Sequence, residues 1–314
     1  MRALVRKTSN VTYLDELGVD RIIGDVQNPK SVDRAVKGSD IVLHLATAPD
    51  WKPAPEHWST SYHGTLNILD AALKHGVQRL VHCSTIGVLG FAGDTPLNET
   101  APYAPSLYSP YAIIKCKAEK AALNCWHKGL PVSIVRPAQV YGPRDTGTMG
   151  LAFKWIQRGF FPLIGGGNAL LQPVHVHDVV TAILLAMERD AALGQTYNIA
   201  GDMFLSFKEF FTIIMRAFGS RARKLPIPRS VAWTLGYLLE KKTQLFGGYA
   251  FLTRFRVECA TRNMIYDISK ACNELGFVPE LGVEKGVMQT VRWCQENENA
   301  VRGDIATLDL TTTR

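Results

Sequence analysis

The chain has 314 residues, of which 46% are hydrophobic and 20% are charged, so it is long enough to bury the core of one large or two smaller α/β domains. Its formal net charge is +7, but the basic residues are scattered apart from one small cluster between Arg221 and Arg229, which argues against a nucleic-acid-binding surface. No apolar run reaches the roughly 18 residues of a membrane-spanning helix, and the first residues lack the apolar stretch of a signal peptide. We therefore expect a cytoplasmic protein that binds a small molecule and no nucleic acid.

Short β-branched and apolar runs alternate with helical patterns along the first half of the chain. This alternation is typical of βαβ units on a parallel sheet. The predicted strands cover Ala3–Val5, Arg21–Ile23, Ile41–Leu45, Leu80–Cys83 and Val132–Val135.

Helix signals follow these strands. Two predicted helices start with a polar cap residue followed by proline at the first helical position, and another ends at a glycine. The predicted helices begin at Asn28-Pro29, cover Ser59–His75 up to Gly76, and extend from Ser109-Pro110 to about His127.

Beyond Gly142 the pattern changes to Gly- and Pro-rich loops between aromatic-rich helices, which predicts a smaller second region that caps the first. We expect His175–Val180 and Tyr197–Ile199 to return as strands to the main sheet. The first region would comprise residues 1–143 and about 172–200, and the second about 144–171 and 201–296. Residues 297–314 are polar and aperiodic, which predicts a disordered tail.

Tyr111 and Lys115 lie four residues apart on a predicted helix, so the phenol and the ammonium project from the same face. A lysine beside a tyrosine favours the phenolate and lowers the pKa of the phenol from about 10. Tyr111 could then act as a general acid or base on a substrate hydroxyl. Taken alone, this spacing is more often that of a surface pair.

The context of the pair makes a catalytic role more specific. About 26 residues earlier, a predicted strand ends in a segment that carries the hydroxyls of Ser84 and Thr85. In a parallel sheet, residues just past the carboxyl end of a strand lie where ligands bind. The order of strand, hydroxyl pair, loop and capped helix therefore predicts an active site.

Further motifs occur in order along the chain: Gly24-Asp25-Val26, His44-Leu45-Ala46, Arg136-Pro137 with Val140-Tyr141-Gly142-Pro143, His175-Val176-His177-Asp178, Tyr197–Gly201, Tyr266-Asp267 and Leu275–Pro279. Together with Tyr111 and Lys115, they resemble the extended short-chain dehydrogenase/reductase family, also called the NAD-dependent epimerase/dehydratase family. The resemblance covers residues 2–295 and is nearest the 3β-hydroxysteroid dehydrogenase and dihydroflavonol reductase branches. It implies a Rossmann-like, doubly wound parallel sheet with a smaller C-terminal region that caps the substrate.

The resemblance also implies roles for individual residues. Tyr111 would be the proton donor or acceptor, Lys115 would tune it and bind the nicotinamide ribose, and Thr85 would be the catalytic hydroxyl. The other expected cofactor contacts are Asp25 and Val26 at the adenine, and Leu45, Ala46, Pro137 and Val140 toward the nicotinamide.

Arg6 follows the first predicted strand, where NAD-specific relatives carry an acidic residue for the ribose hydroxyls. An arginine there can instead pair with a 2′-phosphate. We therefore expect NADP as the cofactor, with NAD possible, although a strand-end arginine is also typical of a solvated surface.

The family's fold begins with a strand, a Gly-rich turn and a helix N-terminus that receives the cofactor pyrophosphate. No GxxGxxG or GxGxxG motif occurs before residue 40, and residues 1–6 match the family's second strand. Since the first strand normally lies between the second and the fourth, its absence predicts two hydrophobic strands facing a gap in the sheet. We therefore expect that the chain is a truncated form of a longer protein. If it is complete, cofactor binding should be weak or absent.

The substrate is expected to be largely apolar. Many nucleotide-sugar members have an arginine shortly before the segment His175–Asp178, and residues 171–174 contain none. The segments Leu225–Arg229, Val231–Leu239 and Phe246–Phe251 are apolar and aromatic, which is typical of a pocket lining, of a peripheral membrane contact or of a second core.

Three functions remain open at this stage. The first is an oxidoreductase that moves a hydride between nicotinamide and a secondary alcohol or ketone on a steroid- or flavonoid-like substrate. The second is a nucleotide-sugar epimerase or dehydratase, and the third is a degenerate, non-catalytic relative. The family also leads us to expect a possible homodimer.

No metal site is expected. His175 and His177 would share a strand face but lack a third ligand, and Asp178 is the expected cap of the following helix. The six cysteines show no ligand spacing, so we expect them to be reduced and buried. Ser61 stands where the family usually has an asparagine, which weakens the expected support around the tyrosine.

Overall fold

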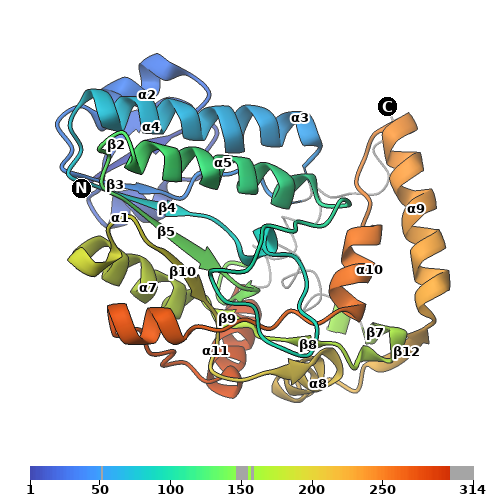
Figure 1. The fold of residues 1–314 in the computed structure, drawn as a ribbon. Helices are drawn as coiled ribbons and strands as arrows, with labels where there is room; N and C mark the ends of the chain where they lie inside the picture. Colours follow the sequence, from blue (N-terminus) through green and yellow to red (C-terminus); the bar gives the residue numbers. More distant parts are fainter. Residues whose placement is uncertain (51, 146–154, 157–158, 298–314) are drawn as a thin grey trace.

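A computed structural model describes residues 1–50, 52–145, 155–156 and 159–297 (Figure 1). Its main sheet has four parallel strands in the order β10-β5-β4-β3. Their bounds are Ile41–His44 for β3, Arg79–Cys83 for β4, Val132–Pro137 for β5 and Thr196–Ile199 for β10. β5 is buried along its whole length, as expected for a central strand with both faces covered. The predicted parallel sheet is confirmed.

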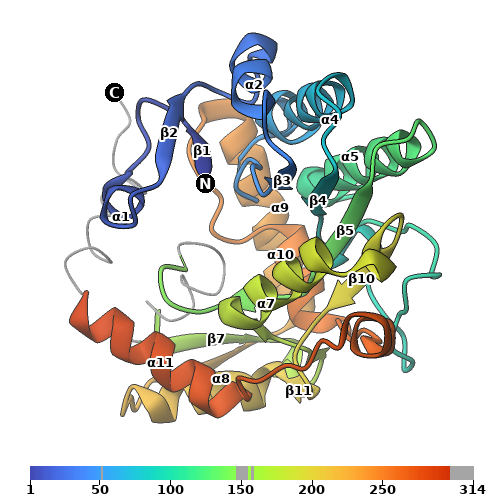
Figure 2. The ribbon, with the colours of Figure 1, turned by 90° about the vertical axis from the view of Figure 1, so that its left-hand side faces the viewer.

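Helices lie on both faces of this sheet (Figures 1 and 2). α2 (Pro29–Val36), α4 (Gly64–Lys74) and α5 (Pro110–Trp126) lie on one face, and α7 (Val176–Glu188) lies on the other. One hydrophobic core joins the first three helices to the strands, and a larger one joins α7 to the second region. The predicted Rossmann-like, doubly wound class is therefore confirmed.

The predicted helix signals have the expected geometry. The side chains of Asn28 and Ser109 accept backbone hydrogen bonds at the starts of α2 and α5, and each is followed by proline. Gly76 has a φ of 65° just after α4, a conformation that favours glycine. The helix predicted from Ser59 starts five residues earlier, because α3 (Ala54–Glu56) continues through a π-helical segment, His57–His63, into α4.

β1 (Arg2–Val5) and β2 (Asp20–Ile23) form a separate parallel pair. Figure 2 shows β1 between β2 and β3, yet among the described residues β1 forms no ladder with β3. The predicted interruption between these hydrophobic strands is confirmed.

The interruption leaves apolar side chains of β3 exposed. Ile41 is 44% exposed, Leu43 is 40% exposed, and Leu45, just after the strand, is 54% exposed. The alternate residue Val42 packs into the core shared with α4. On the other face of the sheet, α7 packs on β4 and β5 and does not extend over β3, so the face with Ile41 and Leu43 is not covered by this helix.

The second region contains short strands and the later helices. Two small sheets pair β7 (Phe160–Ile164) with β12 (Arg223–Ile227) in parallel, and β8 (Leu170–Leu171) with β11 (Leu205–Ser206) antiparallel. The helices are α8 (Phe207–Ala217), α9 (Arg229–Phe246), α10 (Arg254–Thr261) and α11 (Val283–Glu296). The proposed boundaries of the two regions stay predictions, and residues 298–314 of the expected tail lie outside the described residues.

The remaining elements are short. They are α1 (Thr12–Glu16), α3 (Ala54–Glu56), β6 (Val140–Tyr141) paired with β9 (Val174–His175), the 3₁₀ turns Ile86–Val88, Gly165–Gly167 and Asp190–Ala192, and the π-helical turn Ala271–Leu275. Within the described ranges, no helix combines the length and apolar character needed to cross a bilayer.

Two sequence predictions around His175 are wrong. The segment His175–Val180 is not a strand of the main sheet, because α7 begins at Val176. The cap of α7 is His175, whose side chain accepts a hydrogen bond from the backbone N of His177, rather than Asp178. Asp178 instead accepts from the backbone N of Glu280. The whole motif therefore has a structural explanation.

The interrupted sheet predicts unequal costs for one substitution on neighbouring strands. Leu80→Ala on β4, where the side chain is fully buried, should lower the free energy of unfolding by about 2–5 kcal/mol. Leu43→Ala on the exposed face of β3 should cost about 1 kcal/mol or less. Urea unfolding measures both. Equal losses would mean that this face of β3 is covered in solution.

Candidate active site

The start of α5 places three side chains along one helix face. The Ser109 hydroxyl accepts from the backbone N of Ala112 at 3.2 Å, which fixes the first turn. Tyr111, Lys115 and Glu119 then follow at intervals of one turn. Lys115 is 3% exposed and Glu119 is fully buried, so this face of the helix points into the protein.

The Lys115 ammonium is tied to the end of β4. Its Nζ donates to the backbone carbonyl of Cys83 at 2.5 Å. Burial lowers the pKa of Lys115, while Cys83 and Glu119 act in the opposite direction. This contact joins the middle of α5 to the strand that carries the candidate catalytic hydroxyl.

Tyr111 is a neutral phenol in this structure. Burial raises its pKa, Cys83 and Asp50 act in the same direction, and a hydrogen bond with the Thr85 side chain opposes them. Lys115 is not among the described groups that shift the pKa of the Tyr111 phenol. The expectation that Lys115 makes the phenol acidic is therefore wrong here, because desolvation of the phenolate outweighs the helical spacing.

Thr85 caps the turn that follows β4. Its hydroxyl accepts from the backbone N of Gly87 at 3.2 Å, which fixes the side chain at the carboxyl end of the strand. Thr85 and Tyr111 line the same cavity. The structure thus brings together two of the three predicted catalytic side chains, while Lys115 lies behind them.

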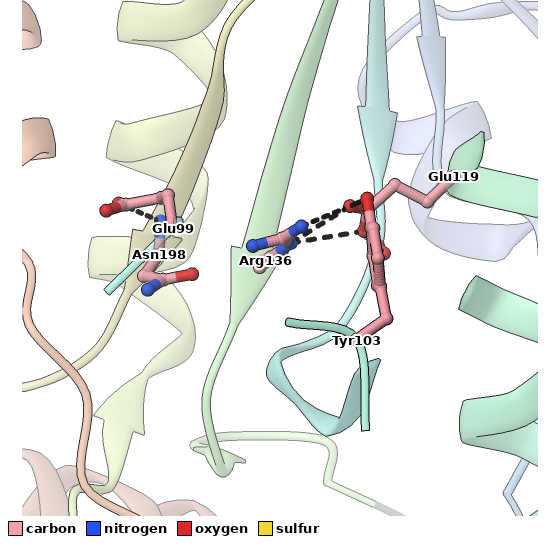
Figure 3. A network of polar contacts seen from close by, with 6 residues as sticks. Glu99, Tyr103, Glu119, Arg136 and Asn198 are labelled. Carbon is pink, nitrogen blue, oxygen red and sulfur yellow. Dashed lines mark hydrogen bonds and ion pairs between the residues drawn. The ribbon is translucent and has the colours of Figure 1, made fainter. Parts of the chain in front are cut away.

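A buried polar network surrounds Glu119 (Figure 3). Arg136 on β5 donates Nε and Nη2 to the carboxylate at 3.0 and 2.5 Å. The hydroxyls of Tyr103 and Ser84 donate to it at 2.7 and 2.5 Å. These donors compensate the cost of burying the charge. Because Ser84 precedes Thr85, the network also fixes the end of β4 against α5.

Glu99, in the loop between β4 and α5, binds β10, which pairs with β5 on the side away from β4. Figure 3 shows it beside Asn198 of β10, whose backbone N donates to the Glu99 carboxylate at 2.8 Å. Burial raises the pKa of Glu99. The loop between β4 and α5 is thereby held at two points, by Tyr103 to Glu119 of α5 and by Glu99 to Asn198 of β10.

Buried histidines occupy the interior next to Lys115. His44 and His82 lie opposite each other on β3 and β4, with ring centroids 5.1 Å apart. Burial lowers the pKa of His44 to about 3, and burial and the nearby Lys115 lower that of His82 well below its usual value. His57 is also buried, edge-on to Tyr111 with centroids 5.6 Å apart. His44 and His82 are therefore neutral at neutral pH.

The residues expected to contact the cofactor follow the carboxyl ends of successive parallel strands. Arg6 follows β1, Asp25 and Val26 follow β2, Leu45 and Ala46 follow β3, Pro137 ends β5, and Val140 lies in β6. Val26 and Pro137 are buried, Asp25 is partly buried, and the others are exposed. Their contact with a cofactor stays a prediction.

The two ends of a dinucleotide fit this edge differently. Thr85, Tyr111 and Val140 line one cavity, which suits a nicotinamide and its ribose, whereas Leu45 and Ala46 are exposed at the end of β3 and do not line it. For the pyrophosphate, the described residues provide no strand and Gly-rich turn between β1 and β3. The helix N-terminus that binds a pyrophosphate in such folds is therefore lacking in the described part.

The cavity beside Thr85 and Tyr111 has a volume of about 510 Å³. Eight aromatic residues besides Tyr111 line it, and they come from distant segments: Phe91, Trp155, Phe161, Phe207, Phe211, Phe251, Phe255 and Tyr266. The rings of Phe161 and Phe211 stack at 4.1 Å. Polar side chains in the wall include Asp50, Gln139 and Arg256. The site therefore pairs two hydroxyls with a mostly apolar chamber.

Most of this wall was missed in the sequence, because its residues share no local motif. The apolar segment Phe246–Phe251 was the available signal, and Phe251 does line the cavity. Val231–Leu239 does not, because α9 packs its inner face on a small core and leaves its outer face exposed.

The structure also places Ser61 and the six cysteines, which the sequence analysis singled out. The Ser61 hydroxyl accepts from the backbone N of Ala48 at 3.0 Å, so it supports the loop after β3. All six cysteines are free, but only Cys116 and Cys125 are buried, so the expectation of general burial is wrong. Within the described ranges, no group of His, Cys, Asp and Glu side chains is arranged to hold a metal.

Comparison with known proteins agrees with this architecture. The model of the NAD dependent epimerase/dehydratase family matches residues 1–200. The chain is 28% identical over 292 residues to a 3beta-hydroxysteroid-dehydrogenase/decarboxylase of Arabidopsis thaliana, a match that covers 87% of this chain and 66% of that protein. It is also 28% identical over 297 residues to a 2-alkyl-3-oxoalkanoate reductase of Stenotrophomonas maltophilia, covering 91% of this chain and 90% of that one.

A solved structure has the same fold. The dTDP-glucose 4,6-dehydratase of Streptomyces venezuelae, with NAD bound, superposes with a TM-score of 0.78 at 24% identity. The superposition covers 95% of this chain and 88% of that one. At this identity the likeness concerns the fold alone.

The neutral, buried His44 predicts a loss of stability in acid. Its pKa of about 3 lies below the unfolded value, so the unfolded chain binds the additional proton. The contribution of neutral His44 to the free energy of unfolding is fully present above about pH 6.5. It declines as pH falls, by about 2 kcal/mol at pH 5. Urea unfolding at pH 7 and 5 should show this additional loss in the wild type and not in His44→Leu. Val42→Ala should keep the wild-type difference, and a His44→Leu protein that also kept it would contradict the assignment.

Proposed function

Because the chain belongs to the NAD-dependent epimerase/dehydratase family, we propose that it is an NAD(P)-dependent oxidoreductase acting on a secondary alcohol or ketone of a largely apolar substrate. The supporting observation is the position of Thr85 and Tyr111 together in the wall of an apolar cavity. A ketone oxygen between the two hydroxyls would place the rest of the substrate against the aromatic wall.

The residues divide the work in the direction of reduction. Thr85, whose position is fixed by its bond to Gly87, orients the substrate oxygen. Tyr111, whose phenol is protonated at neutral pH, donates its proton to that oxygen as the hydride adds to the carbonyl carbon. Bound NAD(P)H supplies the hydride. Lys115 would hold the nicotinamide ribose on exchanging its bond to the Cys83 carbonyl.

The apolar substrate class is supported by the cavity wall. Eight aromatic residues besides Tyr111 line a chamber of about 510 Å³, a volume within the usual range for small-molecule sites. A steroid- or flavonoid-like ring system, or an alkyl ketone, would bury its apolar surface there. The polar groups of the wall, Gln139 and Arg256, would then select for a few polar substituents.

A preference for NADP is supported by Arg6. The side chain is exposed directly after β1, where a guanidinium can bind a 2′-phosphate through paired hydrogen bonds. The expected homodimer and the cytoplasmic location stay predictions.

Tyr111→Phe should test the proposal. Removing the phenol hydroxyl should lower kcat for NADPH-dependent reduction of an apolar ketone by about 10²–10⁴-fold, because the proton donor is lost while the ring remains. Suitable ketones are a 3-oxosteroid and a 2-alkyl-3-oxoalkanoate. The control is Tyr108→Phe, outside the cavity wall. NADPH fluorescence titration measures cofactor binding separately, and binding is expected to be weak because the described residues lack a pyrophosphate cradle.

Two results would contradict this function. One is a Tyr111→Phe protein with the turnover of the wild type. The other is purification with tightly bound cofactor together with binding of UDP- or dTDP-sugars, which would point to an epimerase or dehydratase instead.

A further inference from the structure

α9 has an apolar outer face that the rest of the described protein does not cover. In Figure 1 the helix stands at the edge of the molecule, beyond α10. Its outward apolar residues recur at helical spacing, so they form one stripe. They are Val231, Leu235, Leu238, Leu245 and Phe246, which are between 42% and 75% exposed. Contiguous exposed apolar surface of this kind marks a binding surface.

The position of α9 is fixed, so the exposure is not a sign of a loosely placed helix. A side chain at Gly236 would meet the backbone N of Arg254 at 3.1 Å, which shows how closely α9 and α10 approach. Glu240 accepts from the side chain and the backbone N of Arg254 at 2.8 and 2.7 Å. The inner residue Ala232 packs into a core with Leu252. The outer stripe therefore has a defined direction.

The charges on α9 favour an anionic surface. Arg229, Lys241 and Lys242 are exposed, whereas the helix's one acidic residue, Glu240, is neutralised by its ion pair with Arg254. Lys242 lies within the apolar stripe, where its long stem can extend along apolar surface and its ammonium can reach polar head groups. An apolar stripe with basic residues on and beside it is the pattern of a helix that lies on a bilayer surface.

α9 is also continuous with the substrate cavity. The segment after it contributes Phe251 and Leu252 to the cavity wall, and α10, packed on its inner face, contributes Phe255 and Cys259. A contact on α9 would therefore lie directly beside the chamber for an apolar substrate.

We propose that the outer face of α9 docks on an anionic lipid bilayer, with Leu238, Leu245 and Phe246 inserted among the lipids and Lys241 and Lys242 at the phosphate head groups. The contact is peripheral and reversible. It does not depend on the proposed oxidoreductase activity, so either proposal can fail without the other.

Sedimentation with vesicles tests the proposal. The wild-type protein should bind vesicles made of equal parts phosphatidylcholine and phosphatidylglycerol more tightly than vesicles of phosphatidylcholine, and salt should weaken this preference because it screens charge. Lys241→Gln/Lys242→Gln should weaken binding to the anionic vesicles by about tenfold or more. Leu238→Ser/Leu245→Ser/Phe246→Ser should weaken it at least as much, by removing the inserted side chains.

Matched controls come from other exposed surfaces. Lys30→Gln/Lys37→Gln, in α2 and directly after it, and Val278→Ser/Met288→Ser beyond the cavity should bind as the wild type does. Thermal unfolding checks that each variant is folded. Hydrogen exchange of the wild type provides a second measurement without substitution, in which anionic vesicles should slow exchange in α9 and leave α2 unchanged.

Three results would overturn the proposal. The wild type could fail to bind the anionic vesicles, or the α9 variants could bind as tightly as their controls. Light scattering could also show a dimer that the apolar α9 variant converts to a monomer, which would assign the stripe to a second copy of the chain.

Discussion

The buried carboxylate of Glu119 is the interaction on which the geometry of the site depends. It lies on the same face of α5 as Tyr111 and Lys115, and it binds Arg136 of β5 together with the hydroxyl next to Thr85. A buried charge with several donors is costly to disturb: removal of one partner of such a pair typically costs about 3–5 kcal/mol. The helix and the two strand ends therefore form one unit, and the two hydroxyls of the cavity keep their relative positions because of it.

The gap in the sheet separates β1 and β2 from the strands that carry the Glu119 network. β4 and β5, which hold the network, belong to the four-stranded sheet, whereas β1 and β2 are a separate pair. The pair is held to the rest through α2, which packs on both strands and on α4. Gly24 marks this contact, since a Cβ there would lie 2.6 Å from the Cβ of Ser31 in α2. The proposed proton-transfer end of the site is thus built on other strands than those that would carry the adenine end.

The sequence predicted those features that local patterns encode. Short β-branched and apolar runs predicted the strands, Asn28 and Ser109 predicted the helix starts, and the absence of a Gly-rich loop predicted the break between β1 and β3. The pKa of Tyr111 was predicted in the wrong direction, because helical spacing places Lys115 on the same face but does not reveal that its ammonium bonds the Cys83 carbonyl. The aromatic wall was largely missed, because only the folded chain brings its distant segments together.

A double-mutant cycle between Ser84→Ala and Glu119→Gln tests the central claim most directly. The free energy of unfolding is measured by urea for the wild type, both single variants and the double variant. If the Ser84 hydroxyl anchors the end of β4 to the Glu119 carboxylate, the two substitutions should couple by about 1.5–3 kcal/mol, as expected for a hydrogen bond to a charged group. Effects that add to within about 0.5 kcal/mol would show that the two residues act separately, and the account of a single locked unit would be wrong.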